Sequence, residues 1–250
     1  REGRPRWIRW WPCGRTERRM TVYRDSFYWF CLLFLVSVAG FWPSYFARLG
    51  SDGVHVTHHA HGIVMLLWVA MLITQSWLIR TRRNPMHRTL GKASFVLAPL
   101  IVITAVWVNN YFARREEPPF PDDFVGTFWF GYFLAFAFAV LYGLAILHRR
   151  RVKPHARYMS ATALVFLVPG LGRLLGNHLP PLIGWAPTFY QITLVPLAIG
   201  LWLLYLDWRN DQPLQPFLVF NGLWIGHLVM WEVAPKMRVW HDLLVWAGGS

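Results

Sequence analysis

Charged residues are scarce in this chain of 250 residues: Asp, Glu, Lys and Arg make up 15% of it, whereas hydrophobic residues make up 55%. Acidic residues are the rarer kind, with 12 Asp and Glu against 25 Lys and Arg. Several runs without charge approach the ~20 residues that cross the apolar core of a bilayer. The sequence therefore predicts an integral membrane protein and excludes a globular soluble enzyme.

Cysteine and the common catalytic motifs are also lacking. Cys13 and Cys31 are too few for a disulfide framework and do not have the spacing of metal ligands. The chain contains no Walker loop, nucleotide-binding fingerprint, HExxH zinc-protease motif or GxSxG motif. No residue is therefore assigned a catalytic role, and whether the chain is an enzyme is left open.

The basic residues that give the chain its net charge of +13 are concentrated in three places. They lie in the N-terminal head, at 80–92 and at 149–157, and each group adjoins a hydrophobic run. This distribution is typical of cytoplasmic loops that orient a membrane protein. A nucleic-acid partner is not expected, because there is no folded polar face to carry a basic surface.

Seven hydrophobic segments predict an all-α fold, a polytopic transmembrane helical bundle of about seven spans. They lie at about 26–47, 55–79, 89–112, 124–148, 157–176, 186–207 and 214–232. Each is expected to be a helix, because backbone groups in lipid must form their hydrogen bonds within the segment. The basic loops place the N-terminus in the cytoplasm and the acidic loop 115–123 on the outer side.

Two terminal segments flank this transmembrane domain of residues 26–232. Residues 1–25 form a basic extension with seven arginines before Met20, and we expect it to be either an interfacial anchor or a segment upstream of a natural start at Met20. Residues 233–250 contain tryptophans and are predicted to lie along the membrane interface.

Four histidines stand at the start of the second predicted span, in "VHVTHHAHG" at 54–62. Successive residues of a helix are rotated by about 100°, so His55, His58 and His59 share a face and His61 lies on another. The four histidines cannot all bind one ion from a regular helix. His58 and His61, about 60° apart, are the predicted pair, with His59 in reserve.

Ionisable side chains within spans are costly and therefore mark candidate functional sites. In the predicted topology the fifth span ends at the outer side with Arg173 and His178, and the seventh span carries His227. We expect a polar pocket in the outer half of the bundle. Its predicted cofactor-binding residues are His58, His61, His227, Arg173 and His178, and its predicted metal ligands are His58, His61 and His227.

Structural roles are the alternative for each of these residues. The four histidines at the start of the second span could cap their helix and contact the 115–123 loop. His227 could make an interhelical hydrogen bond, and the Arg173 guanidinium could extend to lipid headgroups. Three further histidines occupy arginine-rich turns: His87, His148 and His155. Solvated turns, a second redox site and a lipid-headgroup site are the interpretations open for them.

The stretch "HHAHGIVMLLWVAMLITQSWLIRTRRNPMHRTLGKASFVLAP" at 58–99 resembles uncharacterised bacterial inner-membrane proteins. In these proteins histidines open a helix, and an HR-x-LG signature follows at the next cytoplasmic turn. The element "HGIVM" at 61–65 is similar, more distantly, to cytochromes of the b561 type, which bind haem b between histidines of neighbouring helices. The resemblance implies a multi-pass protein of the bacterial cytoplasmic membrane, and it implies haem b with His227 or His178 as the second ligand.

Three functional interpretations remain. The first is a carrier, sensor or assembly factor that binds a small ligand or metal ion in the outer pocket. The second is a redox protein that binds haem b or quinone through transmembrane histidines. The third is a structural membrane protein without a ligand site. The lipid bilayer is the expected partner in all three, with haem, quinone and a transition metal ion as candidate ligands.

Overall fold

The computed structural model describes residues 25–50, 53–178 and 188–248, and all regular structure in these ranges is helical. The all-α fold is therefore confirmed for the described chain. The α-helices are α2 (Ser26–Phe41), α3 (Val56–Arg80), α4 (Asn84–Gly91), α5 (Ser94–Ala113), α6 (Asp122–Leu147), α7 (Val152–His178), α9 (Thr188–Arg209), α10 (Gln215–Val233) and α11 (Arg238–Gly248). Two short 3₁₀ turns are η2 (Phe46–Arg48) and η3 (Ala234–Lys236). Residues 1–24 of the predicted basic extension lie outside the described ranges.

Six helices of the described chain are long and apolar enough to cross a membrane: α3, α5, α6, α7, α9 and α10. The multi-pass membrane class is thus supported by structure as well as by composition. The seventh apolar helix, α2, has 16 residues, which corresponds to about 24 Å of helix against roughly 30 Å of hydrocarbon. Seven spans therefore remain a prediction.

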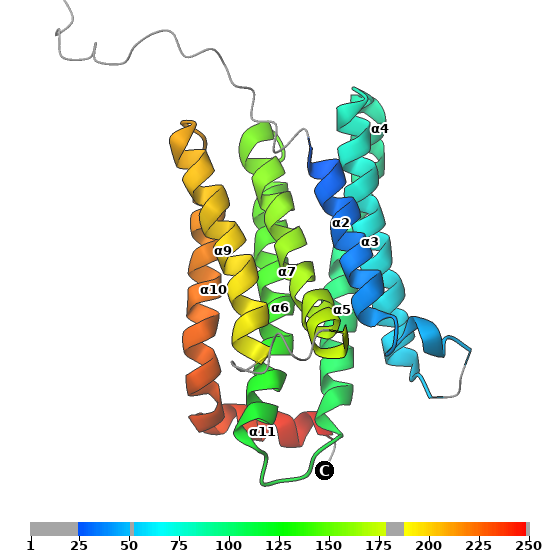
Figure 1. The fold of residues 1–250 in the computed structure, drawn as a ribbon, viewed down its shortest axis with the longest axis vertical. Coiled ribbons are helices and arrows are strands. Elements are labelled where there is room, and N and C mark those ends of the chain that lie inside the picture. Colours follow the sequence, from blue (N-terminus) through cyan, green and yellow to red (C-terminus); the bar gives the residue numbers. More distant parts are fainter. Residues whose placement is uncertain (1–24, 51–52, 179–187, 249–250) are drawn as a thin grey trace, which may run out of the picture.

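The long helices run up and down beside one another (Figure 1). We call the end that carries the basic turns α3–α4 and α6–α7 the arginine end, at the top of Figure 1. We call the opposite end, where α3 begins with the histidine cluster, the histidine end. The predicted boundaries of α3, α6, α9 and α10 agree to within two residues. The predictions were wrong at three other places: α2 ends at Phe41 rather than 47, α5 begins at Ser94 rather than 89 because 84–91 forms the separate helix α4, and α7 begins at Val152 rather than 157.

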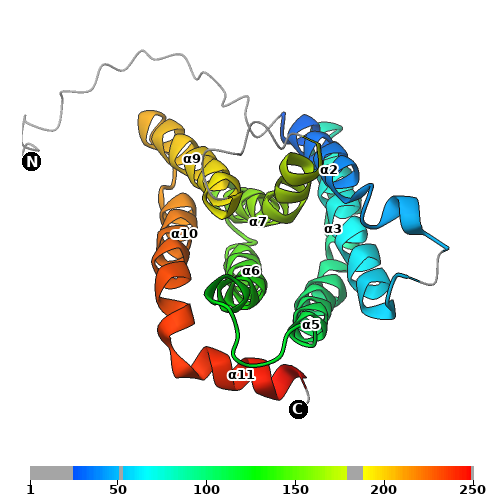
Figure 2. The same cartoon turned by 60° about the horizontal axis from the view of Figure 1, so that its bottom comes forward.

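Helices α6 and α7 occupy the middle of the bundle. Helix α6 packs against α5, α7 and α10, and α7 packs against α2, α6 and α9. Helices α3 and α10 lie on opposite sides of this central pair (Figure 2). The core between the helices is rich in aromatic side chains that are fully buried, among them Trp68, Phe138, Phe217, Phe220 and Trp224.

Helix α2 packs most closely against α7 through two glycines. A Cβ atom on Gly40 would overlap the carbonyl oxygen of Gly170. The Asn177 side-chain amide also donates a hydrogen bond of 3.3 Å to the Gly40 carbonyl. Helix α7 contains Pro169, and its last turns lean toward α2 (Figure 2). Small residues at this crossing let two backbones approach, as is common between membrane helices.

The C-terminal helix α11 lies across the histidine end of the bundle (Figures 1 and 2). It packs against α5 and α6. Leu244 and Ala247 of α11 are buried in a small apolar cluster with Ala113, Val125 and Phe128. The position of this segment at a membrane interface stays a prediction.

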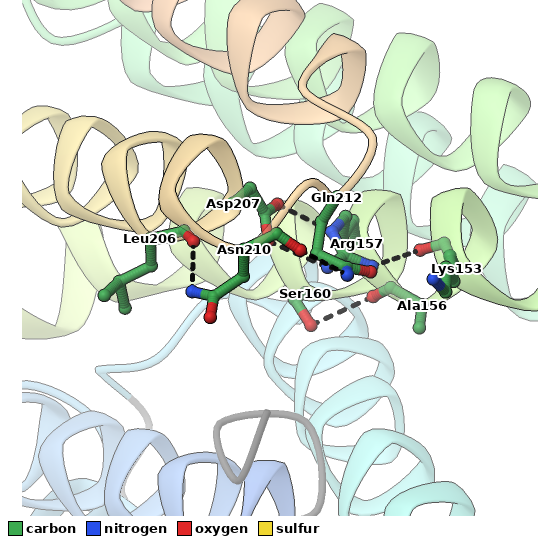
Figure 3. A network of polar contacts seen from close by, with 8 residues as sticks. All are labelled: Lys153, Ala156, Arg157, Ser160, Leu206, Asp207, Asn210 and Gln212. Carbon is green, nitrogen blue, oxygen red and sulfur yellow. Dashed lines mark hydrogen bonds and ion pairs between the residues drawn. The ribbon is translucent and has the colours of Figure 1, made fainter. Parts of the chain in front are cut away.

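A buried ion pair joins α7 to α9 at the arginine end (Figure 3). Arg157 donates from Nε to Asp207 Oδ2 over 2.6 Å and from Nη2 to Asp207 Oδ1 over 2.8 Å. The exposed fractions of the two side chains are 3% and 1%. Bidentate geometry of this kind is the strongest form of an Arg–carboxylate contact.

Candidate functional site

The first histidine of the cluster has a structural role. His55 is the N-cap of α3, and its Nδ1 accepts a hydrogen bond from the Thr57 backbone N–H over 3.4 Å. Its ring stacks on Tyr111 of α5, with centroids 4.1 Å apart. A side-chain acceptor satisfies a backbone donor that a helix N-terminus otherwise leaves unpaired. His55 therefore lies before the first turn of the helix. The prediction that it shares a helical face with His58 and His59 was wrong, because that prediction assumed a regular helix from 55 onward.

His59 faces the 3₁₀ segment that follows α2. Its Nδ1 lies 3.2 Å from the Tyr45 hydroxyl, and the two rings are in contact. Tyr45 also packs close to Gly62, one helical turn further along α3. His59 thus joins α3 to the 42–48 segment and points away from the face that carries His61.

His61 points toward α5, where its Nδ1 lies 3.0 Å from Thr104 Oγ1. The Thr104 hydroxyl donates its own proton to the Leu100 carbonyl over 2.7 Å. Thr104 Oγ1 can then only accept from His61, so the neutral His61 ring carries its proton on Nδ1. The lone pair on His61 Nε2 is therefore available to accept a hydrogen bond or to coordinate an electrophile.

Two arginines and two histidines form the candidate site, which we call the His–Arg cluster: His58, His61, Arg115 and Arg173. Arg173 lies close enough to interact electrostatically with both His58 and His61. Arg115 interacts in the same way with His58 and with Arg173. The Arg173 guanidinium stands 4.4 Å above the ring of Phe41, and its Nη1 donates to the Pro169 carbonyl over 3.4 Å.

The cluster is cationic, and no ion pair within the described chain joins its arginines to an acidic side chain. The ion pairs found there join Arg80 to Asp25, Arg157 to Asp207 and Arg238 to Asp242. Neither Arg115 nor Arg173 is among them. A pair of arginines held near each other without a carboxylate is suited to a carboxylate, a phosphate or another anionic group of a ligand.

His227 does not join this cluster. It is 1% exposed, and its ring stacks on Phe133 with centroids 4.2 Å apart. Its Nδ1 accepts a hydrogen bond of 3.1 Å from the indole N–H of Trp129 on α6. Its helix, α10, packs against α6, α7 and α9, whereas α3 packs against α2, α4 and α5. We predicted that His227 contacts His58 and His61, but the described residues show no such contact.

The bond from Trp129 also fixes which nitrogen of His227 is protonated. An indole N–H can only donate, so a neutral His227 ring must carry its proton on Nε2. A ligating histidine instead donates from one ring nitrogen and binds the metal through the other. His227 thus has the opposite arrangement to His61, because its Nδ1 is occupied by the Trp129 indole. Its predicted part as a haem or metal ligand stays a prediction.

No group of three or more His, Cys, Asp or Glu side chains within the described ranges could hold a metal ion. The three predicted metal ligands are accordingly not assembled there. The side chain of His178, the last residue of α7, lies outside the described residues. Its predicted part in a cofactor site is therefore untested.

Several residues that shape the site were not singled out from the sequence. Tyr111 and Thr104 come from α5. Each could have been found from the sequence as a hydroxyl-bearing residue at the same depth in the membrane as a histidine on the neighbouring helix. Arg115 lies at the start of the loop that we interpreted as acidic. Asn109 and Asn110, which the sequence does place at the outer end of the third span, join α5 to α6: Asn109 donates to the Phe128 carbonyl over 3.0 Å, and Asn110 accepts from the Tyr132 hydroxyl.

The chain was compared with known families, proteins and structures. No family model, no curated protein and no solved structure matches the chain. The resemblance to His-opened inner-membrane proteins and to b561-type cytochromes therefore stays an expectation from the sequence.

Proposed function

We propose that this chain is a carrier, sensor or assembly factor of the bacterial cytoplasmic membrane that binds a small anionic ligand at the His–Arg cluster. We further propose seven spans with a cytoplasmic N-terminus, which places the cluster in the outer half of the bundle. The observation that carries the proposal is that Arg173 of α7 lies within electrostatic range of His58 and His61 of α3, and Arg115 within range of His58 and Arg173.

The chemistry of the cluster supports an anion that also carries a hydrogen-bond donor. Arg173 and Arg115 supply guanidinium donors, which pair with carboxylate or phosphate in two parallel hydrogen bonds. His61 supplies an acceptor at Nε2, because its Nδ1 proton is directed at Thr104. A hydroxy acid or a monoprotonated phosphate satisfies both requirements.

The test is the thermal stability of detergent-purified protein in a series of sodium salts: chloride, acetate, citrate and phosphate. A ligand at 100 times its Kd stabilises the folded state by about 2.7 kcal/mol. We expect citrate or phosphate to raise the midpoint in wild type and not in Arg173→Gln. Arg114→Gln, an exposed arginine beside the cluster, is the matched control and should keep the effect. Equal responses in wild type and Arg173→Gln would contradict the proposal.

A quinone-binding redox protein is the second candidate. The flat stack of His55 on Tyr111, 4.1 Å between centroids, favours it, because an aromatic wall beside an arginine suits a planar carbonyl compound. Extraction of the purified protein with organic solvent and chromatography of the extract would test it. Quinone that co-purifies with wild type and is lost in Arg173→Gln would favour this candidate over the first.

A further inference from the structure

A shallow depression of about 470 Å³ lies at the arginine end of the bundle, opposite the end where α3 begins with the histidine cluster. Its walls come from two turns. The α6–α7 turn contributes His148, Arg151 and Lys153, and the α9–α10 turn contributes Pro213 and Gln215. We call this depression the basic groove.

Two of the side chains that line the basic groove, Arg151 and Lys153, are basic, and none is acidic. Arg151 and Lys153 are exposed, and neither takes part in the ion pairs of the described chain. Helix α7 begins at Val152, so the backbone N–H groups and the positive dipole end of this helix also lie at the groove. All of these features favour an anion.

The buried ion pair of Arg157 with Asp207 holds the two walls of the groove in place. Arg157 Nη1 donates to the Lys153 carbonyl over 3.1 Å, and Nη2 reaches Gln212 Oε1 at 3.5 Å. One guanidinium therefore contacts the first turn of α7 and the α9–α10 turn at the same time (Figure 3). The groove is bounded by fixed elements rather than by two independent loops.

An apolar depression of about 320 Å³ adjoins the basic groove along the chain. Leu214 and Leu218 line it from α10 and the turn before it, and Leu201 and Trp208 line it from α9. Leu214 stands between Pro213 and Gln215, which line the basic groove. A charged depression and an apolar one that share the segment 213–218 match an amphiphile better than a soluble anion.

We infer that the basic groove binds the phosphate headgroup of an anionic membrane lipid, with an acyl chain lying along α9 and α10. Basic pockets between helices at the cytoplasmic side of a membrane protein recognise such headgroups. The site is separate from the His–Arg cluster and rests on the proposed function only for the cytoplasmic placement of the arginine end.

The test is native mass spectrometry of the full chain released from detergent after addition of phosphatidylglycerol or phosphatidylcholine. Two double variants remove the same charge from the same turn. Arg151→Gln with Lys153→Gln changes the groove, whereas Arg149→Gln with Arg150→Gln changes exposed neighbours that do not line it. The exchange Arg151→Lys with Lys153→Arg keeps the charge and controls for folding.

We expect wild type to retain phosphatidylglycerol in preference to phosphatidylcholine. The groove double variant should bind phosphatidylglycerol roughly 30-fold more weakly, the equivalent of two basic residues near a charged surface. The neighbour double variant and the charge-preserving exchange should bind as wild type does. Equal losses in both double variants would overturn the inference, because binding would then follow total charge. Displacement of the lipid by inorganic phosphate at lower concentration would overturn it too, because the site would then be one for soluble phosphate.

Discussion

The hydrogen-bond partner of each histidine decides its role more than its place in the sequence does. His61 donates to a threonine hydroxyl and keeps an acceptor nitrogen available, whereas His227 accepts from an indole and carries its proton on the other nitrogen. His55 caps a helix. These three histidines thus have three different hydrogen-bonding arrangements, and among them only His61 keeps an acceptor nitrogen that a ligand could use.

His87, in the turn helix α4, is expected to make the stability of the protein depend on pH. Burial lowers the pKa of His87 below its ordinary value of 6.5, the charges of His155 and Arg88 lower it further, and a hydrogen bond to the Gln75 backbone partly offsets this. The unfolded chain then binds more protons than the folded one. The contribution of His87 to the free energy of unfolding is therefore fully present above pH 6.5 and is lost as the pH drops below it.

The measurement is the thermal midpoint of detergent-purified protein between pH 7.5 and pH 5, in wild type and in His87→Gln (roughly the range in which histidine titrates). The variant should lose less of its midpoint on acidification than wild type does. Parallel curves for the two proteins would show that His87 does not contribute to the acid sensitivity.

Asp207→Asn is expected to be among the most destabilising single changes in the chain. It leaves the Arg157 guanidinium buried without its counter-charge, which costs about 3–5 kcal/mol of unfolding free energy. Asp25→Asn is the matched control, since it breaks the Arg80–Asp25 pair, whose side chains are 32% and 37% exposed. An exposed pair of this kind contributes about 0–1 kcal/mol. Similar midpoints for the two variants in a thermal melt would argue against the buried pair as a fixed link.

At the scale of elements, the crossing of α2 and α7 depends on two glycines. Gly40→Ala should destabilise the protein by about 1–3 kcal/mol, because the added methyl overlaps the Gly170 carbonyl and forces the helices apart. Gly143→Ala is the control, since nothing lies within 4 Å of its Cβ position, and replacing glycine with alanine within a helix is favourable by roughly 1 kcal/mol. Thermal melts that rank the two variants in the opposite order would refute this packing.

The helices themselves could be predicted from the sequence because their signal is local. A run such as 55–79 has no charge to interrupt it and must form its hydrogen bonds internally, so helix α3 (Val56–Arg80) follows closely. Helix α4 was not predicted as a separate element, because the break at 92–93 between Gly91 and Ser94 has no strong composition signal. The position of α11 across the bundle depends on packing that the sequence does not specify.

The candidate site was less predictable, because it depends on which helices are neighbours. His58, His61 and Arg173 were predicted to be close; Arg173 lies within electrostatic range of both histidines, and their joint role in a site stays a prediction. His227 was predicted to meet them, since its depth is similar, but depth does not specify the side of the bundle. The Arg157–Asp207 pair was missed, although a single Asp after "LWLLYL" next to basic turns is a usable signal.

At the scale of the whole molecule, the basic turns predict the orientation in the membrane, with the arginine end in the cytoplasm. Single cysteines at Arg149 and Glu116, in a chain whose Cys13 and Cys31 are replaced by serine, would report it. A membrane-impermeant maleimide should label the cysteine at Glu116 in intact cells, and the cysteine at Arg149 only after the membrane is opened. The reverse pattern would show that the arginine end faces outward.

The central claim is that one anionic ligand contacts both His61 and Arg173. The most direct measurement is the citrate- or phosphate-induced shift in thermal midpoint for wild type, His61→Ala, Arg173→Gln and the double variant, with His227→Leu as the residue outside the cluster. We predict that either single change removes most of the shift and that the double variant loses little more, since side chains on one ligand are coupled. His227→Leu should unfold at a lower temperature yet keep the shift. Independent, additive losses from His61 and Arg173, or a shift abolished by His227→Leu, would contradict the account.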